Sequence, residues 1–373
     1  MGKEVKTPRF YVDIPTFLHA TGDLHWANSP RGEAGLYMNP SNPYMYNPTD
    51  TWTFKIGNFS NTPKTSFPIN FVALLNHNLA SDTPFKIKGI EGTGMGVQNW
   101  KNLPASTRYK RNILNAEANN DNLAPVYNGT SIFETIELNG YWNFFGIEYE
   151  DSVYDLESHQ LGAFVVGKYW DAPNSPDLEL TMERRFEGIK RQKTIDGKTL
   201  TNTYYDGPVE WTMNHHIDNT LNGTYKYPPF ELDTTKQVDT EGYRFDYRTK
   251  SGLGRKGLRS WNLTFSYISE SDIWMENEVS NTLTSDYVTP DDNIPNPMLS
   301  DNSFNFVWNC TLGGALPFIF QPNAPKYDSA GNMTQGDNSP DQFSICTFRG
   351  DSLDVTQVSS NVYNLSVTID EVG

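Results

Sequence analysis

The chain has 373 residues, a formal net charge of −16 and an aromatic content of 13%. This negative charge creates no broad positive field, which argues against nucleic acid and anionic membranes as partners. The 20 Tyr, 21 Phe, 23 Pro and 28 Gly favour many short strands and turns over helices. We therefore expect a mainly β protein, and a chain of this length favours two domains, with one large domain as the alternative.

The first residues, MGKEVKTPRFYVDIP, lack the apolar stretch of a secretory signal, and no apolar run approaches the ~18 residues of a membrane span. We therefore expect a soluble protein that is made inside a cell. A Pro- and Asn-rich run at 39–48 cannot hold a regular strand ladder. Residues 1–44 are predicted to form an extended arm that lies on a neighbour, unless the N-terminal part joins the sheet.

Strand patterns recur at short intervals between residues 45 and 167. Most alternate apolar and polar residues, which places the apolar side chains on one face, and INFVALL at 69–75 is typical of a fully buried strand. His77 follows between two asparagines and is predicted to lie in a turn. This spacing predicts a sandwich or a jelly roll. The other apolar positions are Trp52, Phe54, Ile56, Phe85, Ile87, Ile136, Leu138, Phe145, Ile147, Tyr149 and the segment 161–167.

A charged segment at 178–204 is predicted to form a long two-stranded hairpin. Its turn is expected at 195–198, because an Asp-Gly pair is a strong hairpin signal. Docking on an acidic patch of an adjacent copy and simple exposure to solvent both explain the local positive charge of this hairpin. The basic residues are Arg184, Arg185, Lys190, Arg191 and Lys193.

The most regular pattern lies between Arg255 and Ser269, where apolar side chains alternate with polar ones and are expected on one face of a strand. A short helix is predicted directly after it, with Ser269 and Asp272 as its N-terminal cap. The alternating residues are Trp261, Leu263, Phe265 and Tyr267.

Three later stretches, at 304–312, 343–345 and 363–369, repeat the same period of two. Together with the earlier strand, and separated by Gly, Pro, Asn and Asp clusters, they predict an antiparallel β-sandwich. Residues 168–373 are therefore predicted to form a β-sandwich with one short helix.

The order of segments in residues 45–167 is W-x-F-x-I-G, an apolar strand, N-H-N-L, F-x-I-x-G, an aromatic strand and G-x-F-x-x-G. This order resembles the galactose-binding-like jelly roll found in many phage structural proteins. Residues 168–373 contain GRKGLRSWNLTFSY, GGALPFIFQP, PDQFSIC and YNLSVTIDEV. Together these segments resemble the tube-type β-sandwich of phage tail and tail-tip proteins.

The resemblance implies a bacteriophage virion structural protein, at the tail tip or baseplate or as an adaptor ring, that is assembled in the host cytoplasm. Its expected partners are copies of itself in a ring and other virion tail proteins. Each copy would offer sheet edges and the hairpin at 178–204 to its neighbours. A capsid decoration or head-to-tail joining protein built from the same folds is an alternative.

A carbohydrate-binding receptor protein of the virion is a second alternative, because exposed aromatic side chains on a jelly roll can stack on sugar rings. Trp100, Tyr141 and Trp142 are the candidate residues, and the ligand would be a host-surface glycan. Packing of these aromatics inside the sandwich or an interface is the competing explanation.

No residue pattern indicates catalysis, a cofactor or a metal. The glycines at 92–96 are not followed by the helix that a phosphate-binding loop needs, because Pro104 comes too early. The adjacent His215 and His216 would point to opposite faces of an extended strand and give no converging ligands. Acidic pairs such as 291–292 arise by chance among 45 acidic residues, so a secreted glycosidase is a weak alternative.

Cys310 and Cys346 are the only cysteines and both lie in apolar strand patterns. A thiol in such a pattern usually behaves as a small buried hydrophobe. We therefore predict two buried thiols, with a disulfide between neighbouring strands as the alternative.

Overall fold

The computed structural model is mainly β, as predicted, and its described helices are short. The described residues are 4–21, 69–77, 163–185, 189–203, 257–275, 302–330, 332–339 and 342–372, together with the other strands named below.

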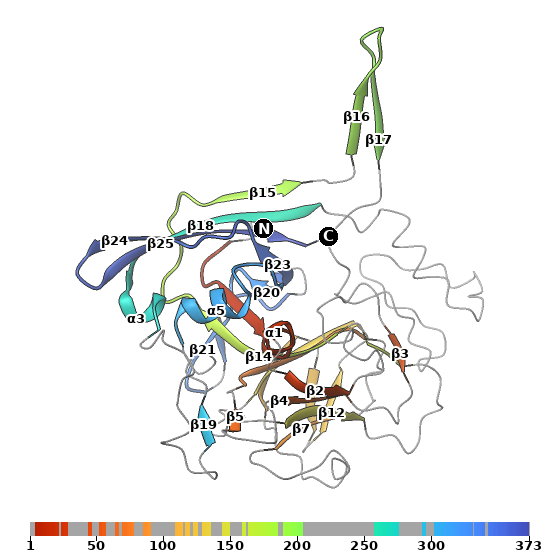
Figure 1. The fold of residues 1–373 in the computed structure, drawn as a ribbon, viewed down its shortest axis with the longest axis vertical. Helices are drawn as coiled ribbons and strands as arrows, with labels where there is room; N and C mark the ends of the chain where they lie inside the picture. The colour runs from red at the N-terminus through yellow and green to blue at the C-terminus, as the bar shows by residue number, and fades with distance from the viewer. Residues whose placement is uncertain are drawn as a thin grey trace.

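Eleven of the described strands form one antiparallel sheet (Figure 1). β24 (Asp354–Ser359) pairs with β25 on the same side as β23. The spatial order of the other strands is β15 (Thr181–Arg185), β18 (Leu258–Ser269), β25 (Val362–Glu371), β23 (Ser344–Phe348), β20 (Phe318–Gln321), β1 (Arg9–Asp13), β14 (Ala163–Asp171), β6 (Phe71–His77), β11 (Gly129–Thr135) and β8 (Tyr109–Leu114).

A second sheet packs against this one through Phe85, whose ring centroid lies 6.3 Å from that of Phe133 in β11. Its order is β2 (Leu24–Asn28), β4 (Trp52–Ile56), β12 (Phe144–Tyr149), β7 (Phe85–Ile90), β10 (Asn122–Pro125) and β9 (Ala116–Asn119). Four strand pairs complete the described strands: β3 (Tyr44–Tyr46) with β13 (His159–Leu161), β5 (Lys64–Ser66) with β19 (Asn293–Pro295), β16 (Ile189–Lys193) with β17 (Thr199–Thr203), and β21 (Lys326–Tyr327) with β22 (Met333–Gln335).

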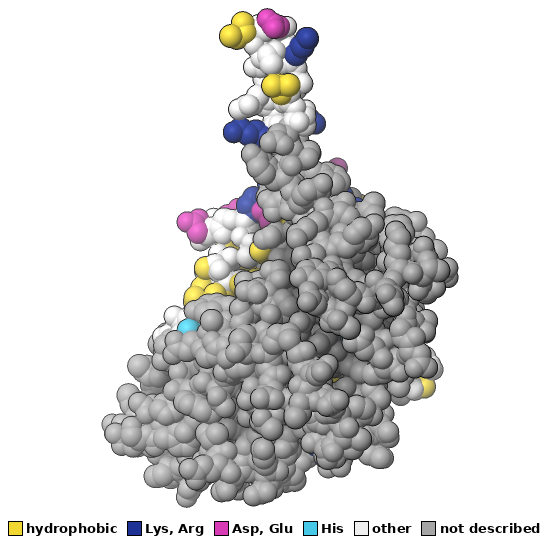
Figure 2. Space-filling view, turned by 90° about the vertical axis from the view of Figure 1, so that its right-hand side faces the viewer, with side chains coloured by type: hydrophobic (Ala, Val, Ile, Leu, Met, Phe, Trp, Pro, Cys, Tyr) yellow, Lys and Arg dark blue, Asp and Glu magenta, His cyan; other side chains and the backbone are white. Residues whose placement is uncertain are grey.

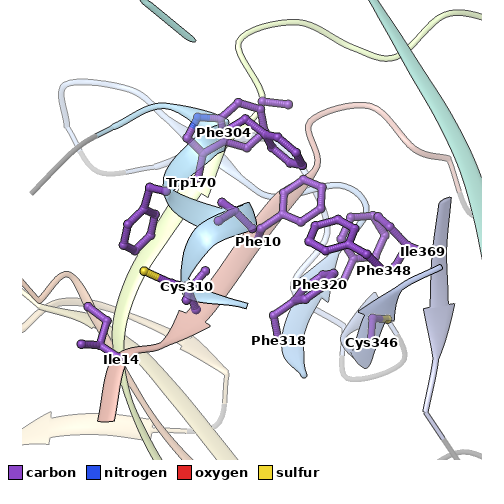
Figure 3. Packing of buried hydrophobic residues seen from close by; sticks show 14 of the residues in the cluster. Phe10, Ile14, Trp170, Phe304, Cys310, Phe318, Phe320, Cys346, Phe348 and Ile369 are labelled. Atoms are coloured by element: carbon purple, nitrogen blue, oxygen red, sulfur yellow. The ribbon is translucent and has the colours of Figure 1, made fainter. Parts of the chain in front are cut away.

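The main core is a cluster of aromatic rings centred on Phe10 of β1 (Figure 3). The Phe10 ring lies 5.2 Å from that of Phe320 and 5.6 Å from that of Phe304, centroid to centroid. Trp261 of β18 also lies 5.1 Å from Phe320, although β25 and β23 separate their strands in the sheet. The sheet therefore curls around this core. The other rings around Phe10 are Trp170, Phe318 and Phe348.

Residues 9–13 form β1 between β14 and β20, so the alternative that the N-terminal part joins the sheet is confirmed for this segment and an extended arm is wrong there. Phe10 and Val12 belong to the aromatic core, whereas Tyr11 is buried on the opposite face, where its hydroxyl donates a hydrogen bond to Gln321 at 2.8 Å. Both faces of β1 are therefore covered, and both of its edges are paired with neighbouring strands. The predicted arm of 1–44 also contains a helix and β2 where it is described.

The predicted domain boundary at 167 and 168 falls inside β14, so the large sheet continues across it. Gly167 lies at this point, and a Cβ atom there would come within 2.0 Å of the Val12 carbonyl oxygen. Only glycine permits so close an approach of β14 to β1. His77, predicted to lie in a turn, instead ends β6, and its buried Nε2 lies 2.9 Å from the Ser131 hydroxyl.

The predicted strand at 261–267 is confirmed up to Phe265 and is then interrupted by a bulge before Ile268. Tyr267 has a φ of 59°, uncommon for a bulky residue, and is 77% exposed. Its amide donates a hydrogen bond to the Asn364 side chain at 3.1 Å. The extra residue turns Tyr267 outward and brings Ile268 into the core, so the expected inward position of Tyr267 is wrong.

Residues 304–312, predicted to be a strand, contain the helix α5 (Phe304–Cys310). The run FNFVWNC fits a strand or a helix, because its apolar residues are spaced both two and three residues apart. Phe306 and Val307 are adjacent and both buried in the same core, whereas a strand would turn them to opposite faces. Leu312, directly after the C-cap residue Thr311, has a positive φ of 52° and ends the helix, and Gly313 and Gly314 continue in this left-handed conformation.

The helix predicted after β18 is confirmed as α3 (Glu270–Ile273), with Ser269 at its N-cap position, but the Ser269 side chain makes no capping hydrogen bond to the helix backbone. The Ser269 hydroxyl donates a hydrogen bond to the Asp272 carboxylate at 2.6 Å. The strands predicted at 343–345 and 363–369 are confirmed as β23 and β25. Ile136 and Leu138 lie outside the described residues.

A further helix, α1 (Ile14–Thr21), begins directly after β1 and was not predicted. Asp13 precedes it, is 4% exposed, and accepts a hydrogen bond from the Thr16 hydroxyl at 2.5 Å. Burial raises the pKa of Asp13 to about 7, because the charged carboxylate loses its water. The Thr16 hydrogen bonds oppose this increase but are weaker than the effect of burial.

Replacing Phe10 with Ala should lower the free energy of unfolding by about 3–5 kcal/mol, because it opens a cavity among the surrounding rings. Urea unfolding of the purified chain measures this change. Met333→Ala, at a half-exposed position, is the control and should change stability by less than about 0.5 kcal/mol. A Phe10→Ala loss as small as the control would contradict the central position of this ring.

Asp13→Asn should remove a pH dependence of stability. Because the folded-state pKa of Asp13 lies above the ordinary 3.8, the folded protein binds this proton more tightly, and the contribution is lost as pH rises through about 7. Relative to the variant, the wild type should therefore lose roughly 2 to 3 kcal/mol between about pH 5 and 8. Asn retains the cap acceptor. If the difference in unfolding free energy between the wild type and Asp13→Asn is the same at pH 5 and at pH 8, the elevated pKa of Asp13 is refuted.

Candidate functional site

The described residues contain no cluster of metal-ligand side chains. No group of three or more His, Cys, Asp and Glu side chains among them could hold a metal ion. The glycines at 92–96, His215, His216 and the acidic pair at 291–292 lie outside the described residues. No described helix combines the length and the apolar character that a membrane span requires.

Cys310 and Cys346 are both buried and free, as predicted, so the alternative of a disulfide is wrong. Burial raises the pKa of each thiol well above its ordinary value, because the thiolate would lose its water. A thiol held in this state is a poor nucleophile and a poor metal ligand. These two side chains pack the core and carry no chemistry.

The predicted turn at 195–198 is confirmed and closes the hairpin of β16 and β17. The Thr194 amide donates to the Lys198 carbonyl oxygen at 2.8 Å, and the Gly197 amide donates to the Thr194 carbonyl oxygen at 2.9 Å. Gly197 has a φ of 78°. This is a three-residue hairpin loop in which glycine supplies the left-handed residue.

The predicted extent of the hairpin, 178–204, is wrong at its first strand. Residues 181–185 pair instead with β18, where Thr181 lies opposite Asn262 and Arg185 opposite Leu258. The two-stranded hairpin therefore comprises only 189–203. Met182 lies opposite the core residue Trp261, so β15 gains a partner by joining the large sheet.

The hairpin has no core of its own. Figures 1 and 2 show it extending away from the body, with basic side chains and apolar side chains both on its surface. Ile195 at the turn is fully exposed and Leu200 is 60% exposed. A two-stranded hairpin in water is marginally stable on its own. The side chains of this hairpin are therefore available to a partner.

The basic residues of the hairpin point to both of its faces. Arg191 lies opposite Thr201 and Lys193 opposite Thr199 on one face, and Lys190 lies on the other. All three are exposed, and none of them forms an ion pair within the described part of the chain. The hairpin thus presents uncompensated positive charge in a protein of net charge −16.

β15 is an edge strand of the large sheet, and every one of its residues is exposed. Arg184 lies directly opposite Arg259 in β18. Arg259 is already engaged by Glu371 at 2.7 Å, so Arg184 has no carboxylate partner in the described structure. Leu178, just before β15, is fully exposed. This edge therefore carries an unpaired cation and an apolar side chain.

β24 forms a second free edge at the other side of the same ladder. In the described structure it pairs only with β25, from Asp354 opposite Ser366 to Ser359 opposite Val362. Asp351 and Asp354 are exposed, and Val358 is 43% exposed. The sequence analysis did not single out this edge. Its signal in the sequence was the Gly-Asp-Ser turn at 350–352, followed by the β-branched residues Val355, Thr356 and Val358.

The structure brings Arg184 and Arg185 together on β15, and Lys190, Arg191 and Lys193 together on β16. These five residues therefore belong to two separate ladders, not to one hairpin as predicted. Trp100, Tyr141 and Trp142, the candidates for sugar stacking, lie outside the described residues.

The two thiols should resist alkylation in the folded protein. With iodoacetamide the native chain should react at least about tenfold more slowly than the urea-unfolded chain, because burial suppresses the thiolate. Ser359→Cys, at an exposed position of β24, is the control and should react rapidly without urea. Fast labelling of the wild type, located by mass spectrometry at Cys310 or Cys346, would contradict the burial.

Comparison with known proteins gives no match. No protein-family model, curated protein sequence or solved structure matches the chain. What the chain does is therefore inferred from its own residues and contacts.

Proposed function

We propose that the chain is a bacteriophage virion structural protein, a tail tip, baseplate or adaptor ring component that acts by assembling with copies of itself. The virion setting rests on the order of sequence segments described above. The assembly role rests mainly on the hairpin of β16 and β17, which extends from the body with exposed apolar and basic side chains. Such a hairpin gains its stability by contact with a partner.

Two of the edge strands of the sheet, β15 and β24, support the same role. An edge strand presents unpaired backbone donors and acceptors, which readily pair with another chain. β15 and β24 are both exposed edges of the described ladder. A dedicated neighbour that covers them would prevent unspecific pairing and give affinity through backbone hydrogen bonds.

Charge also supports self-assembly. Copies with a net charge of −16 repel one another, so a stable contact between them needs a local compensation. Residues 189–203 contain four basic residues and one acidic residue. This positive hairpin can approach an acidic copy and fix its orientation. No described contact favours the carbohydrate-binding alternative.

Shortening the hairpin should abolish assembly without unfolding the body. We expect the full chain to sediment as an oligomer well above 42.3 kDa, and a variant with Asn-Gly in place of residues 190–202 to shift to the monomer. The body should keep its melting temperature within about 2 °C, because the hairpin contributes nothing to the core. Sedimentation velocity over a concentration series measures both species.

The double variant Lys326→Glu and Met333→Ala changes the exposed pair of β21 and β22 and serves as the matched control. It should assemble like the wild type. A full chain that remains a 42.3 kDa monomer at every concentration tested would overturn the proposed function.

A further inference from the structure

Resting on the proposed function, we infer that the surface receiving the hairpin is the outer edge of β24 in a second copy of this chain. Three observations carry the inference: the free backbone edge of β24, its charge, and its position relative to the hairpin. They define a head-to-tail contact between copies.

The backbone of β24 is open on one side. Five of its six residues pair with β25, Val358 is left out at a register shift, and none pairs with another described strand, so the outward amide and carbonyl groups can accept another strand. Val358 adds an exposed apolar side chain on this edge. The hairpin offers strands as well as the apolar side chains of Ile195 and Leu200, so backbone and side chains are both complementary.

The charges of the two surfaces are opposite. Asp351 and Asp354 are exposed, and neither forms an ion pair in the described part of the chain. Another acidic residue of this region does have a partner, because Asp370 forms an ion pair with Arg349 at an N–O distance of 2.6 Å. Arg191 and Lys193 lie on one face of the hairpin and are likewise unpaired. Contact between the two surfaces would therefore pair acidic side chains of one copy with basic side chains of the next, which have no ion-pair partner in a single copy.

The contact must form between copies. β18 and β25 lie between β15, which leads into the hairpin, and β24. The hairpin also points away from β24 in Figure 1. Because the two surfaces differ, the contact is heterologous, and repeating it adds copies head to tail until a ring closes or a filament grows.

Charge reversal tests the inference on the full chain. One variant combines Arg191→Glu and Lys193→Glu, and a second combines Asp351→Lys and Asp354→Lys. Each alone should raise the apparent dissociation constant of the oligomer by about tenfold or more, because like charges then face one another. Lys326→Glu and Glu4→Lys, at exposed positions elsewhere, are the matched controls and should leave it unchanged.

An equimolar mixture of the two variants is the decisive measurement. When the two variants alternate, the acidic hairpin of the first variant contacts the basic β24 edge of the second. The unchanged basic hairpin of the second variant contacts the unchanged acidic β24 edge of the first. The mixture should therefore assemble at concentrations at which neither variant alone does. Sedimentation velocity gives the masses, and thermal unfolding shows that each variant is folded.

The outcomes separate the two ideas. If the wild type assembles and the hairpin reversal disrupts it, but the reversal at 351 and 354 has no effect, this inference is wrong while the proposed function stands. If the mixture fails to assemble, the inference is also wrong. If the wild type never assembles, the proposed function itself fails.

Discussion

The burial of the Phe10 side chain is the interaction on which the rest of the structure depends. Its ring meets aromatic rings from β14, α5, β20 and β23, which come from both halves of the chain. Each buried aromatic side chain contributes several kcal/mol, and the tilted and edge-on geometries add to this. The N-terminal strand therefore holds the first and the last parts of the chain in one sheet.

The same core explains why the candidate assembly surfaces lie where they do. The central strands bury both faces and find a neighbour on each side, whereas β15 and β24 are left at the margins with one neighbour each. Arg259 and Glu371 satisfy one another beside β15, which leaves Arg184 without a carboxylate. The same arrangement of strands buries the aromatic side chains in the core and leaves one backbone edge of β15 and of β24 without a described partner strand.

Sequence patterns predicted the structure where a local pattern decided it. The alternation of β18 and β25 and the Asp-Gly turn of the hairpin were confirmed, because period and turn chemistry act over a few residues. The helix α5 and the outward Tyr267 were predicted wrongly, and the place of β1 in the sheet was left open between two alternatives, because tertiary packing decided each of them. The exposed charges of the hairpin followed from residue type, but the pairing of β15 with β18 depends on a strand far along the chain.

The position of β1 sets the order in which the fold can form during synthesis. Tyr11 and its hydrogen-bond partner Gln321 are 310 positions apart in the chain. At about 5 to 20 residues per second, a ribosome needs roughly 15 to 60 s to bridge that interval. β1 can pair with β14 first, but its other edge and the Phe10 ring wait for the C-terminal strands. Until then the nascent chain exposes the Phe10 ring and one unpaired edge of β1, so we expect the yield of folded protein to depend on chaperones and on the rate of translation.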